Sequence, residues 1–261
     1  VGLRHAEIYK KNKYCNLKIV CDFDEKRLNL FSKKNKNILA VKNDSEIFDN
    51  NSIDLVSIAS YDEYHYEQIL KCFKAKKHFF IEKPICKNEK ELKKIKNLYF
   101  KNKKSIKFSS NFVLRGNNYL SKIKTELSKI KNEKIFYIEG DYNYGRLEKI
   151  TNGWRSKEKN YSINLGGAIH IIDLFNWFTS SQIQSVIASA NKIVTNKSNF
   201  KYNDFSSSLI KFKDGSIGKI NANFGAIMPH NHLLRIFTNK RTIEYSFNKL
   251  FLYNSRNKNI S

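Results

Sequence analysis

The chain has 261 residues, of which 41% are hydrophobic and 13% aromatic, so it can bury a large core and is not intrinsically disordered. Its 48 lysines and arginines against 24 aspartates and glutamates give a formal charge of +24. No run approaches the roughly 18 uninterrupted apolar residues of a membrane helix, and the first residues show no basic region followed by an apolar run. We therefore expect a cytoplasmic protein without a membrane partner.

The positive charge raises the hypothesis of a nucleic-acid-binding protein, because clustered lysines can track phosphates. The lysines are instead spread along the chain and gather on the polar sides of amphipathic segments such as 88–104. We therefore expect solvated helix faces and no nucleic-acid partner. The cysteines, which form no CxxC pair, are Cys15, Cys21, Cys72 and Cys86. They predict small buried hydrophobic side chains, with neither a metal site nor a disulfide framework.

The first half of the chain alternates strand-like and helix-like segments. Short runs rich in Ile, Val and Phe predict buried strands at residues 17–21, 38–41, 53–60 and 78–82. Ser60 and Glu63 have the spacing of a capping box that would begin a helix, and residues 92–99 carry the apolar stripe of another. Repeated strand-helix units with short connections predict a parallel sheet covered by helices on both sides.

After about residue 110 the pattern changes. Helical segments at 119–130 and 168–178 flank a strand at 134–141. Further strands are predicted at residues 186–194, 205–212, 216–224, 233–237 and 242–247. The Asp214-Gly215 pair suits a hairpin turn between two of these strands. The α/β chain is therefore expected to have a first domain over residues 1–110 and a second over residues 111–261 with a mostly antiparallel sheet.

Two positions in the first domain point to dinucleotide binding. Gly2 stands directly before an amphipathic helix, and Asp22 follows 20 positions later at the end of a predicted strand. In a βαβ fingerprint, the third glycine begins the first helix and an acidic residue about 20 positions later binds the ribose hydroxyls. An aspartate after a strand is also a common turn residue. This interpretation implies a Rossmann domain whose first strand and first two fingerprint glycines are missing.

Two clusters of polar residues could carry chemistry. Glu82-Lys83-Pro84 follows a predicted strand, and a lysine at the carboxyl end of a parallel strand points toward bound ligands. Gly166-Gly167 precedes His170 and Asp173, which lie one turn apart on an otherwise apolar helix. That helix could be a core helix in which the aspartate satisfies the histidine. Alternatively, a lysine that polarises a hydroxyl oxygen and a histidine that accepts its proton would suit alcohol oxidation.

In order and spacing, these residues resemble the glucose-fructose oxidoreductase, inositol dehydrogenase and rhizopine catabolism family (Gfo/Idh/MocA) over nearly the whole chain. The resemblance is carried by Gly2 with His5, Asp22, Ala59 to His65, Glu82-Lys83-Pro84, Gly167 to Asp173, and Asp214-Gly215 through Asn223. It implies an NAD(P)-dependent dehydrogenase that transfers a hydride between the nicotinamide and a CH-OH group of a sugar, nucleotide sugar or cyclitol. It further implies a homo-oligomer formed through the C-terminal sheet and a chain cut at both ends.

The resemblance also assigns roles to residues. Lys83 and His170 are the expected catalytic residues, with Lys83 on the reacting oxygen and His170 as the acid/base. The expected cofactor-binding residues are Gly2, Asp22, Ala59, His65, Glu82 and Lys83. The expected substrate-binding residues are Tyr142, Tyr144, Trp154, Arg155 and Asp173, with Asp141 and His230 as further candidates. Asp173 would orient the His170 imidazole or cap local structure. Asp22 favours NAD, while Lys26 and Arg27 leave NADP open.

Two positions depart from the family pattern. Gly166 stands where the family often has an aspartate, four residues before the histidine, and Tyr61 stands where it commonly has a proline. The missing aspartate keeps a second hypothesis open, a non-redox homologue that binds a nucleotide or sugar in a regulatory or structural role. A hydride-transfer assay separates the two hypotheses.

Overall fold

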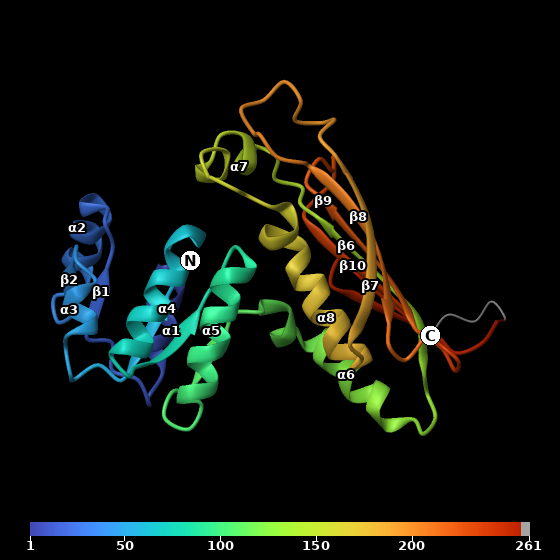
Figure 1. The fold of residues 1–261 in the computed structure, drawn as a ribbon, viewed down its shortest axis with the longest axis horizontal. Helices are drawn as coiled ribbons and strands as arrows, with labels where there is room; N and C mark the ends of the chain where they lie inside the picture. The colour runs from blue at the N-terminus through green and yellow to red at the C-terminus, as the bar shows by residue number, and fades with distance from the viewer. Residues whose placement is uncertain (257–261) are drawn as a thin grey trace. The chain divides into compact units, whose positions relative to one another are not determined.

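The computed structural model describes residues 1–256, and the chain divides into two compact units, Val1–Asn111 and a second unit from Phe112 onward. Figure 1 shows the order of their elements along the chain. The first unit alternates short strands with helices, and the second contains one large sheet. None of the helices within residues 1–256 is long and apolar enough to cross a bilayer.

The first unit contains only parallel strand pairs. Its strands are β1 (Ile19–Cys21), β2 (Leu39–Val41), β3 (Leu55–Ile58), β4 (His78–Ile81) and β5 (Phe108–Ser110). Its helices are α1 (Gly2–Lys11), α2 (Glu25–Lys34), α3 (Ser45–Phe48), α4 (His65–Lys74) and α5 (Glu89–Asn102). β1 pairs with β2, and β4 pairs with β3 and β5. The predicted parallel arrangement is confirmed, although within the described residues it forms two separate sheets.

The core of the first unit lies between β4 and its covering helices. Ile69 and Cys72 of α4 and Ile95 of α5 are buried in one cluster with Phe79. The Phe79 ring stacks on that of Phe108, with centroids 4.7 Å apart. Aromatic and β-branched side chains on a short strand therefore make up for its length, because each buries a large apolar area.

Only one cysteine matches the prediction of a buried hydrophobic side chain. Cys72 is buried, whereas Cys15, Cys21 and Cys86 are partly exposed, and within residues 1–256 all four are free thiols. Burial raises the pKa of the Cys72 thiol to about 12, and burial together with nearby carboxylates raises the pKa of Cys21 and Cys86 to about 11. Cys15 and Cys86 lie in loops, and Cys21 is the last residue of β1.

The capping box predicted at Ser60 and Glu63 is wrong. The backbone is extended at Tyr61, a 3-10 turn follows over Asp62–Tyr64, and α4 begins only at His65. The Ser60 hydroxyl instead donates to the side-chain oxygen of Gln68, 2.6 Å away. The Ser60 hydroxyl thus bonds to the Gln68 side chain and not to a backbone N–H, as a capping box would require.

The second unit is built on a seven-stranded sheet. Its strands are β6 (Ile135–Asn143), β7 (Ile183–Asn191), β8 (Phe205–Phe212), β9 (Ile217–Asn223), β10 (Asn231–Thr238), β11 (Thr242–Ser246) and β12 (Lys249–Tyr253). The order is β12-β11-β10-β6-β9-β8-β7, and among these described strands only the β6–β9 pair is parallel. The mostly antiparallel sheet is confirmed. Gly215 has φ +88° in the turn before β9, as a D-G turn requires.

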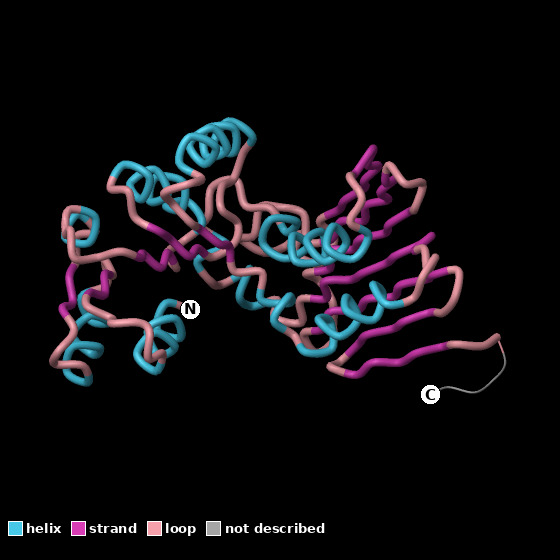
Figure 2. Tube along the Cα trace, turned by 90° about the horizontal axis from the view of Figure 1, so that it is seen from below, coloured by secondary structure: helices cyan, strands magenta, loops and turns pink. Residues whose placement is uncertain are grey.

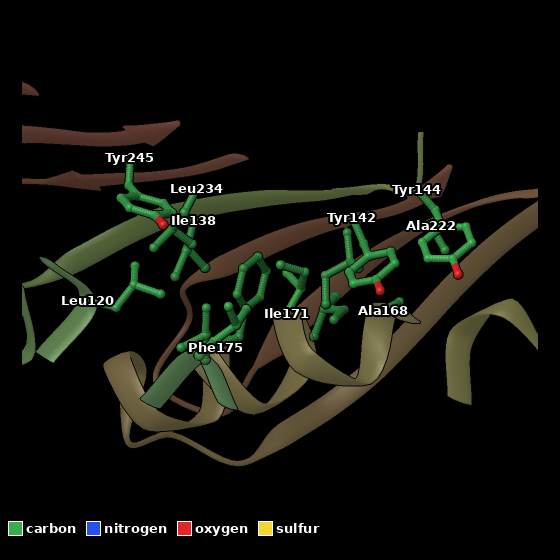
Figure 3. Packing of buried hydrophobic residues seen from close by; sticks show 14 of the residues in the cluster. Leu120, Ile138, Tyr142, Tyr144, Ala168, Ile171, Phe175, Ala222, Leu234 and Tyr245 are labelled. Carbon is green, nitrogen blue, oxygen red and sulfur yellow. The ribbon is translucent and has the colours of Figure 1, made fainter. Parts of the chain in front are cut away.

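Helices cover one face of this sheet (Figure 2). They are α6 (Asn118–Lys129) and α8 (Ile169–Thr179), the latter following a π-helical turn over Asn164–Ala168. The short helix α7 (Glu148–Thr151) instead packs against the 3-10 turn over Trp154–Ser156. Ile171 and Phe175 point from α8 toward the strands (Figure 3). A Cβ added to Gly140 of β6 would lie 2.5 Å from Ile171, so this glycine permits the close approach of α8. By contrast, the edge strand β7 is exposed along its whole length.

Candidate functional site

Several predicted residues of the first unit meet at the carboxyl edge of a parallel sheet. Ala59 follows β3, and Glu82 follows the adjacent strand β4 and donates its backbone N–H to the carbonyl of Ile58 at 2.9 Å. A Cβ built on Gly2, the first residue of α1, would lie 3.7 Å from the Cβ of Ala59. The start of α1 therefore lies beside the loop after β3. Open α/β sheets bind their ligands at this edge.

Asp22 lies at the end of β1 and is about one-third exposed. Its Oδ1 accepts the backbone N–H of Asp24 at 3.0 Å, and the guanidinium of Arg27 lies 3.8 Å from its Oδ2. The turn role and the ligand role weighed from the sequence are therefore compatible. One oxygen shapes the turn, and the other lies near a largely exposed cation that also pairs with Asp24.

Glu82 is held inside the fold by two donors. Its Oε1 accepts from Nδ2 of Asn111 at 2.6 Å and lies 3.1 Å from Nε2 of His5. Burial raises the pKa of Glu82, but these hydrogen bonds and the charges of His5 and Lys83 outweigh it and leave the pKa below its usual value. Glu82 is therefore an anchored carboxylate, which places the partly exposed Lys83 next to it in the chain.

His65 is fully buried. Its Nδ1 lies 2.6 Å from the carbonyl oxygen of Pro84, and its Nε2 lies 3.2 Å from that of Ser60. The ring thus links the loops after β3 and β4. Because no part of the side chain is exposed, we revise the expected direct contact with a cofactor to a positioning role for these two loops.

In the second unit, His170 lies in the first turn of α8 and is 6% exposed. Its ring is parallel to that of Tyr142, with centroids 6.2 Å apart, and meets the Phe112 ring edge-on at 6.1 Å. A Cβ on Gly167 would lie 2.5 Å from the Tyr142 ring, so this glycine lets the ring settle on the start of the helix (Figure 3). The absence of a side chain at Gly167 therefore allows the Tyr142 and His170 rings to pack together.

Asp173 has a charged partner that was not predicted from the sequence. Both carboxylate oxygens of Asp173 accept from Arg115, from Nε and Nη2, each at 2.7 Å. A guanidinium offers two charge-assisted bonds in one plane, which a single imidazole N–H cannot match. Arg115 also lies over the Trp177 ring at 5.4 Å. Asp173 thus forms an ion pair with Arg115, and its roles toward His170 and a substrate stay predictions.

Tyr142 is the centre of a larger group of rings. Tyr144 stacks on it at 6.0 Å, and His230 and His232 approach its ring at 5.3 and 5.0 Å. The two imidazoles are 4.8 Å apart. Together with His170, these residues form what we call the Tyr142 cluster. His232 was missed from the sequence; it lies in β10, two residues after His230, which directly precedes that strand.

Two histidines of the Tyr142 cluster, His230 and His232, are kept neutral by their surroundings. Burial, followed by the charges of His230 and Arg146, lowers the pKa of His232 to about 4. Burial and the charge of Arg146 also lower the pKa of His230, whose Nδ1 lies 3.1 Å from the carbonyl of Asn143. A neutral imidazole has one donor and one acceptor. His230 and His232 can therefore exchange hydrogen bonds with hydroxyl groups without adding charge.

The remaining candidates divide into two groups. Trp154 and Arg155 share a short 3-10 turn, with the guanidinium 4.5 Å from the indole ring, and the charge of Arg155 is felt by Tyr142. Asp141 does not join them, because it precedes Tyr142 in the strand and accepts from Asn221 Nδ2 at 2.8 Å. Successive strand residues face opposite sides of the sheet, so Asp141 belongs to the other face.

The glycine at position 166 has a steric reason. A Cβ built there would overlap the hydroxyl of Tyr161, a buried residue whose ring also packs against Phe200. An aspartate at this position would require Tyr161 to move. The departure from the family pattern is thus compensated locally by a tyrosine, which fills the space one helical turn before His170.

Comparison with known proteins identifies both units. Residues 1–110 match the family model described as oxidoreductase family, NAD-binding Rossmann fold, and residues 131–244 match the GFO/IDH/MocA C-terminal domain. The chain is 23% identical over 252 residues to a myo-inositol 2-dehydrogenase from Thermotoga maritima, covering 93% of this chain and 71% of that protein.

Solved structures share the fold of the whole chain. A myo-inositol 2-dehydrogenase from Lactobacillus plantarum has a TM-score of 0.85 at 19% identity, with 94% of this chain and 73% of that one covered. A scyllo-inositol dehydrogenase from Lactobacillus casei, solved with NAD(H) and scyllo-inositol, has a TM-score of 0.82 at 20% identity, with coverages of 94% and 72%. The resemblance read from the sequence is confirmed.

Proposed function

The chain belongs to the Gfo/Idh/MocA family of NAD-binding oxidoreductases, and from this premise we propose that it is a dehydrogenase of CH-OH groups in a cyclitol or sugar. The observation that carries the proposal is the meeting of Gly2, Ala59 and the Lys83 loop at the ligand-binding edge of a parallel sheet. The cyclitol class is supported by the relatives named for myo-inositol and scyllo-inositol.

The residues of the first unit fit an NAD molecule. Among the described residues, none caps the start of α1 with a side chain, and the first turn of α1 carries no acid. Free backbone N–H groups and a positive helix end suit a pyrophosphate there. Asp22 would accept hydrogen bonds from the adenosine ribose, and its negative charge would repel a 2′-phosphate. Arg27 beside it is the feature that leaves NADP open.

Lys83 and His170 take the two polar roles in the proposed reaction. Lys83 would donate a hydrogen bond to the substrate hydroxyl oxygen, and His170 would accept the hydroxyl proton. NAD, when bound, supplies the acceptor for the hydride that leaves the carbinol carbon. The substrate is oxidised to a carbonyl compound, and His170 releases the proton to solvent.

The Tyr142 cluster is the proposed recognition surface for the polyol, with Trp154 and Arg155 as further contacts. Tyrosine and indole rings offer flat apolar faces that suit the C–H face of a sugar or cyclitol ring. The neutral histidines offer donors and acceptors to its hydroxyls. Both features are expected of a site that binds a neutral, hydroxyl-rich molecule.

We also propose that the chain forms a homo-oligomer through its C-terminal sheet. The edge strand β7 exposes all nine of its residues, including Val186 and Ile187, and Leu209 of the adjacent strand is also exposed. Exposed apolar side chains on an open sheet favour association. Sedimentation velocity checks this, and a monomer at every concentration would contradict it.

The functional test is NADH formation with the full-length protein. Myo-inositol, scyllo-inositol, glucose and a nucleotide sugar are offered with NAD and then with NADP. We expect turnover with at least one polyol and a preference for NAD. Tight binding of NAD without turnover of any of these substrates would instead favour the non-redox homologue.

A further inference from the structure

A chain of hydrogen bonds in the first unit connects helix α1 to three neighbouring strands. The Oγ of Ser57 in β3 lies 2.9 Å from Nδ1 of His5, and Nε2 of His5 lies 3.1 Å from Oε1 of Glu82. Asn111, directly after β5, donates to the same oxygen at 2.6 Å. His5 is 8% exposed, so the connection is sheltered from solvent.

The partners of His5 fix both the proton and the orientation of its ring. A carboxylate only accepts hydrogen bonds, so Nε2 carries a proton, and Nδ1 shares the second hydrogen bond with the Ser57 hydroxyl. The Phe80 ring packs against the imidazole with centroids 5.5 Å apart. Hydrogen bonds at both nitrogens and a ring contact leave His5 no alternative orientation within the fold.

His5 connects the predicted cofactor-binding end of α1 with the loop that carries the predicted catalytic Lys83. Gly2, where the cofactor is expected, is three residues earlier on the same helix. Lys83 directly follows Glu82, the residue that His5 binds. Resting on the proposed function, we propose that His5 is a positioning residue that couples the cofactor-binding end of α1 to the loop presenting Lys83.

The coupling has a definite direction of effect. If α1 shifts, Glu82 must shift with it or lose a donor, and Lys83 moves with Glu82 because the two are joined covalently. Cofactor binding that holds α1 would therefore also hold Lys83, and the two effects must be reciprocal. A purely structural His–Glu pair would add stability to the whole unit without this local effect on the loop.

The first test is hydrogen exchange of residues 82–86 in the full chain without cofactor. His5→Leu should speed exchange of this segment about tenfold or more. In His5→Gln the amide nitrogen can occupy the place of Nε2, so exchange should stay within about threefold of wild type. The control is Lys77→Met, which removes a buried lysine whose Nζ donates to the carbonyls of Asn50 and Ile53 at the opposite end of β4.

The control separates local coupling from general loss of stability. Lys77→Met should lower the unfolding midpoint and leave exchange of residues 82–86 close to wild type. If Lys77→Met and His5→Leu accelerate that segment equally, or if His5→Leu leaves it unchanged, the coupling role is wrong. This result does not depend on any substrate, so it stands even if no polyol is turned over.

The second test uses activity and its pH dependence. With the rate expressed per bound NAD, His5→Leu should lower kcat about 10-fold to 50-fold. His5→Gln should recover most of this loss. The charged groups facing Glu82 are His5 and Lys83. Without His5, burial raises the Glu82 pKa, so the acid limb of the kcat profile should move to higher pH. A reduced kcat with an unshifted profile and no rescue by glutamine would overturn the proposal.

Discussion

The two units assemble their candidate sites from different materials. In the first, Glu82 receives hydrogen bonds from His5 and Asn111, so charge and directional donors fix the position of Lys83. In the second, His170 lies among rings, with Tyr142 at 6.2 Å and Phe112 at 6.1 Å. A polar network tolerates a change of side-chain volume better than the loss of a hydrogen-bond donor. A packed ring cluster tolerates the loss of a donor better than a change of volume.

The largest effect on kcat should come from removing the proposed catalytic side chain of each unit. Lys83→Ala and His170→Gln should each lower kcat by about 100-fold or more, with NAD affinity nearly unchanged. Glutamine keeps most of the volume beside Tyr142 while losing the titratable ring. Steady-state kinetics and calorimetric NAD binding measure the two quantities.

Matched controls come from the same unit as Lys83. Lys90→Ala changes an exposed lysine of α5, and His78→Ala changes a histidine whose Nδ1 accepts the backbone N–H of Lys107. Both variants should keep wild-type kcat. Full activity of His170→Gln would leave α8 as a core helix and nothing more.

The next effect concerns charge at the cofactor ribose. Asp22→Ala should weaken NAD binding by about 1.5 to 3 kcal/mol, the size of a hydrogen bond to a charged group. Asp24→Ala is the control, because Asp24 accepts the Arg27 N–H as the N-cap of α2 without being expected to touch the ribose. Equal losses in the two variants would assign Asp22 to the turn alone.

Adding side-chain volume to the Tyr142 cluster should lower stability. In Gly167→Ala the new Cβ would lie 2.5 Å from the Tyr142 ring and 2.8 Å from Phe224. The free energy of unfolding should fall by about 1 to 3 kcal/mol, as for other overpacked cores. Gly116→Ala is the control, because a Cβ built on Gly116 meets no other side chain or backbone atom of the described residues within 4 Å. Urea unfolding of both variants measures the difference.

The smallest effect is a pH dependence of the same cluster. The pKa of His232 is lowered from 6.5 to about 4 in the folded chain, so the unfolded chain binds more protons between these values. Stability is therefore fully present above pH 6.5 and declines as the pH falls toward 4. From about pH 7.5 to about pH 5.5 the loss from His232 should be about 1.4 kcal/mol. His232→Gln should flatten the profile by that amount.

Much of the fold follows from local patterns in the sequence. The apolar run before Glu82 predicted β4, and the Asp214-Gly215 pair predicted the turn before β9. β12 was not predicted, although its residues 250–253 form an apolar run of the kind that indicates a strand. The capping box failed because Ser60 found a partner in Gln68, which no local rule could reveal.

The site was predicted residue by residue but not as a network. The resemblance supplied Lys83, His170 and Asp22, whose spacing is visible in the sequence. The pairing of Asp173 with Arg115 joins residues 58 positions apart, and the contact of His5 with Glu82 joins residues 77 positions apart. Such partners depend on which strands become neighbours, so they become visible only when the chain has folded.

The cysteines of the first unit have a practical consequence for chemical labelling. With a pKa of about 11 for Cys21 and Cys86 and about 12 for Cys72, roughly one thiol in ten thousand or fewer is ionised near pH 7. The thiolate is the species that attacks maleimides, iodoacetamide and mixed disulfides. Alkylation of these three side chains should therefore be slow while the unit is folded and should accelerate on unfolding, so that the rate of thiol labelling reports the opening of the first unit alone.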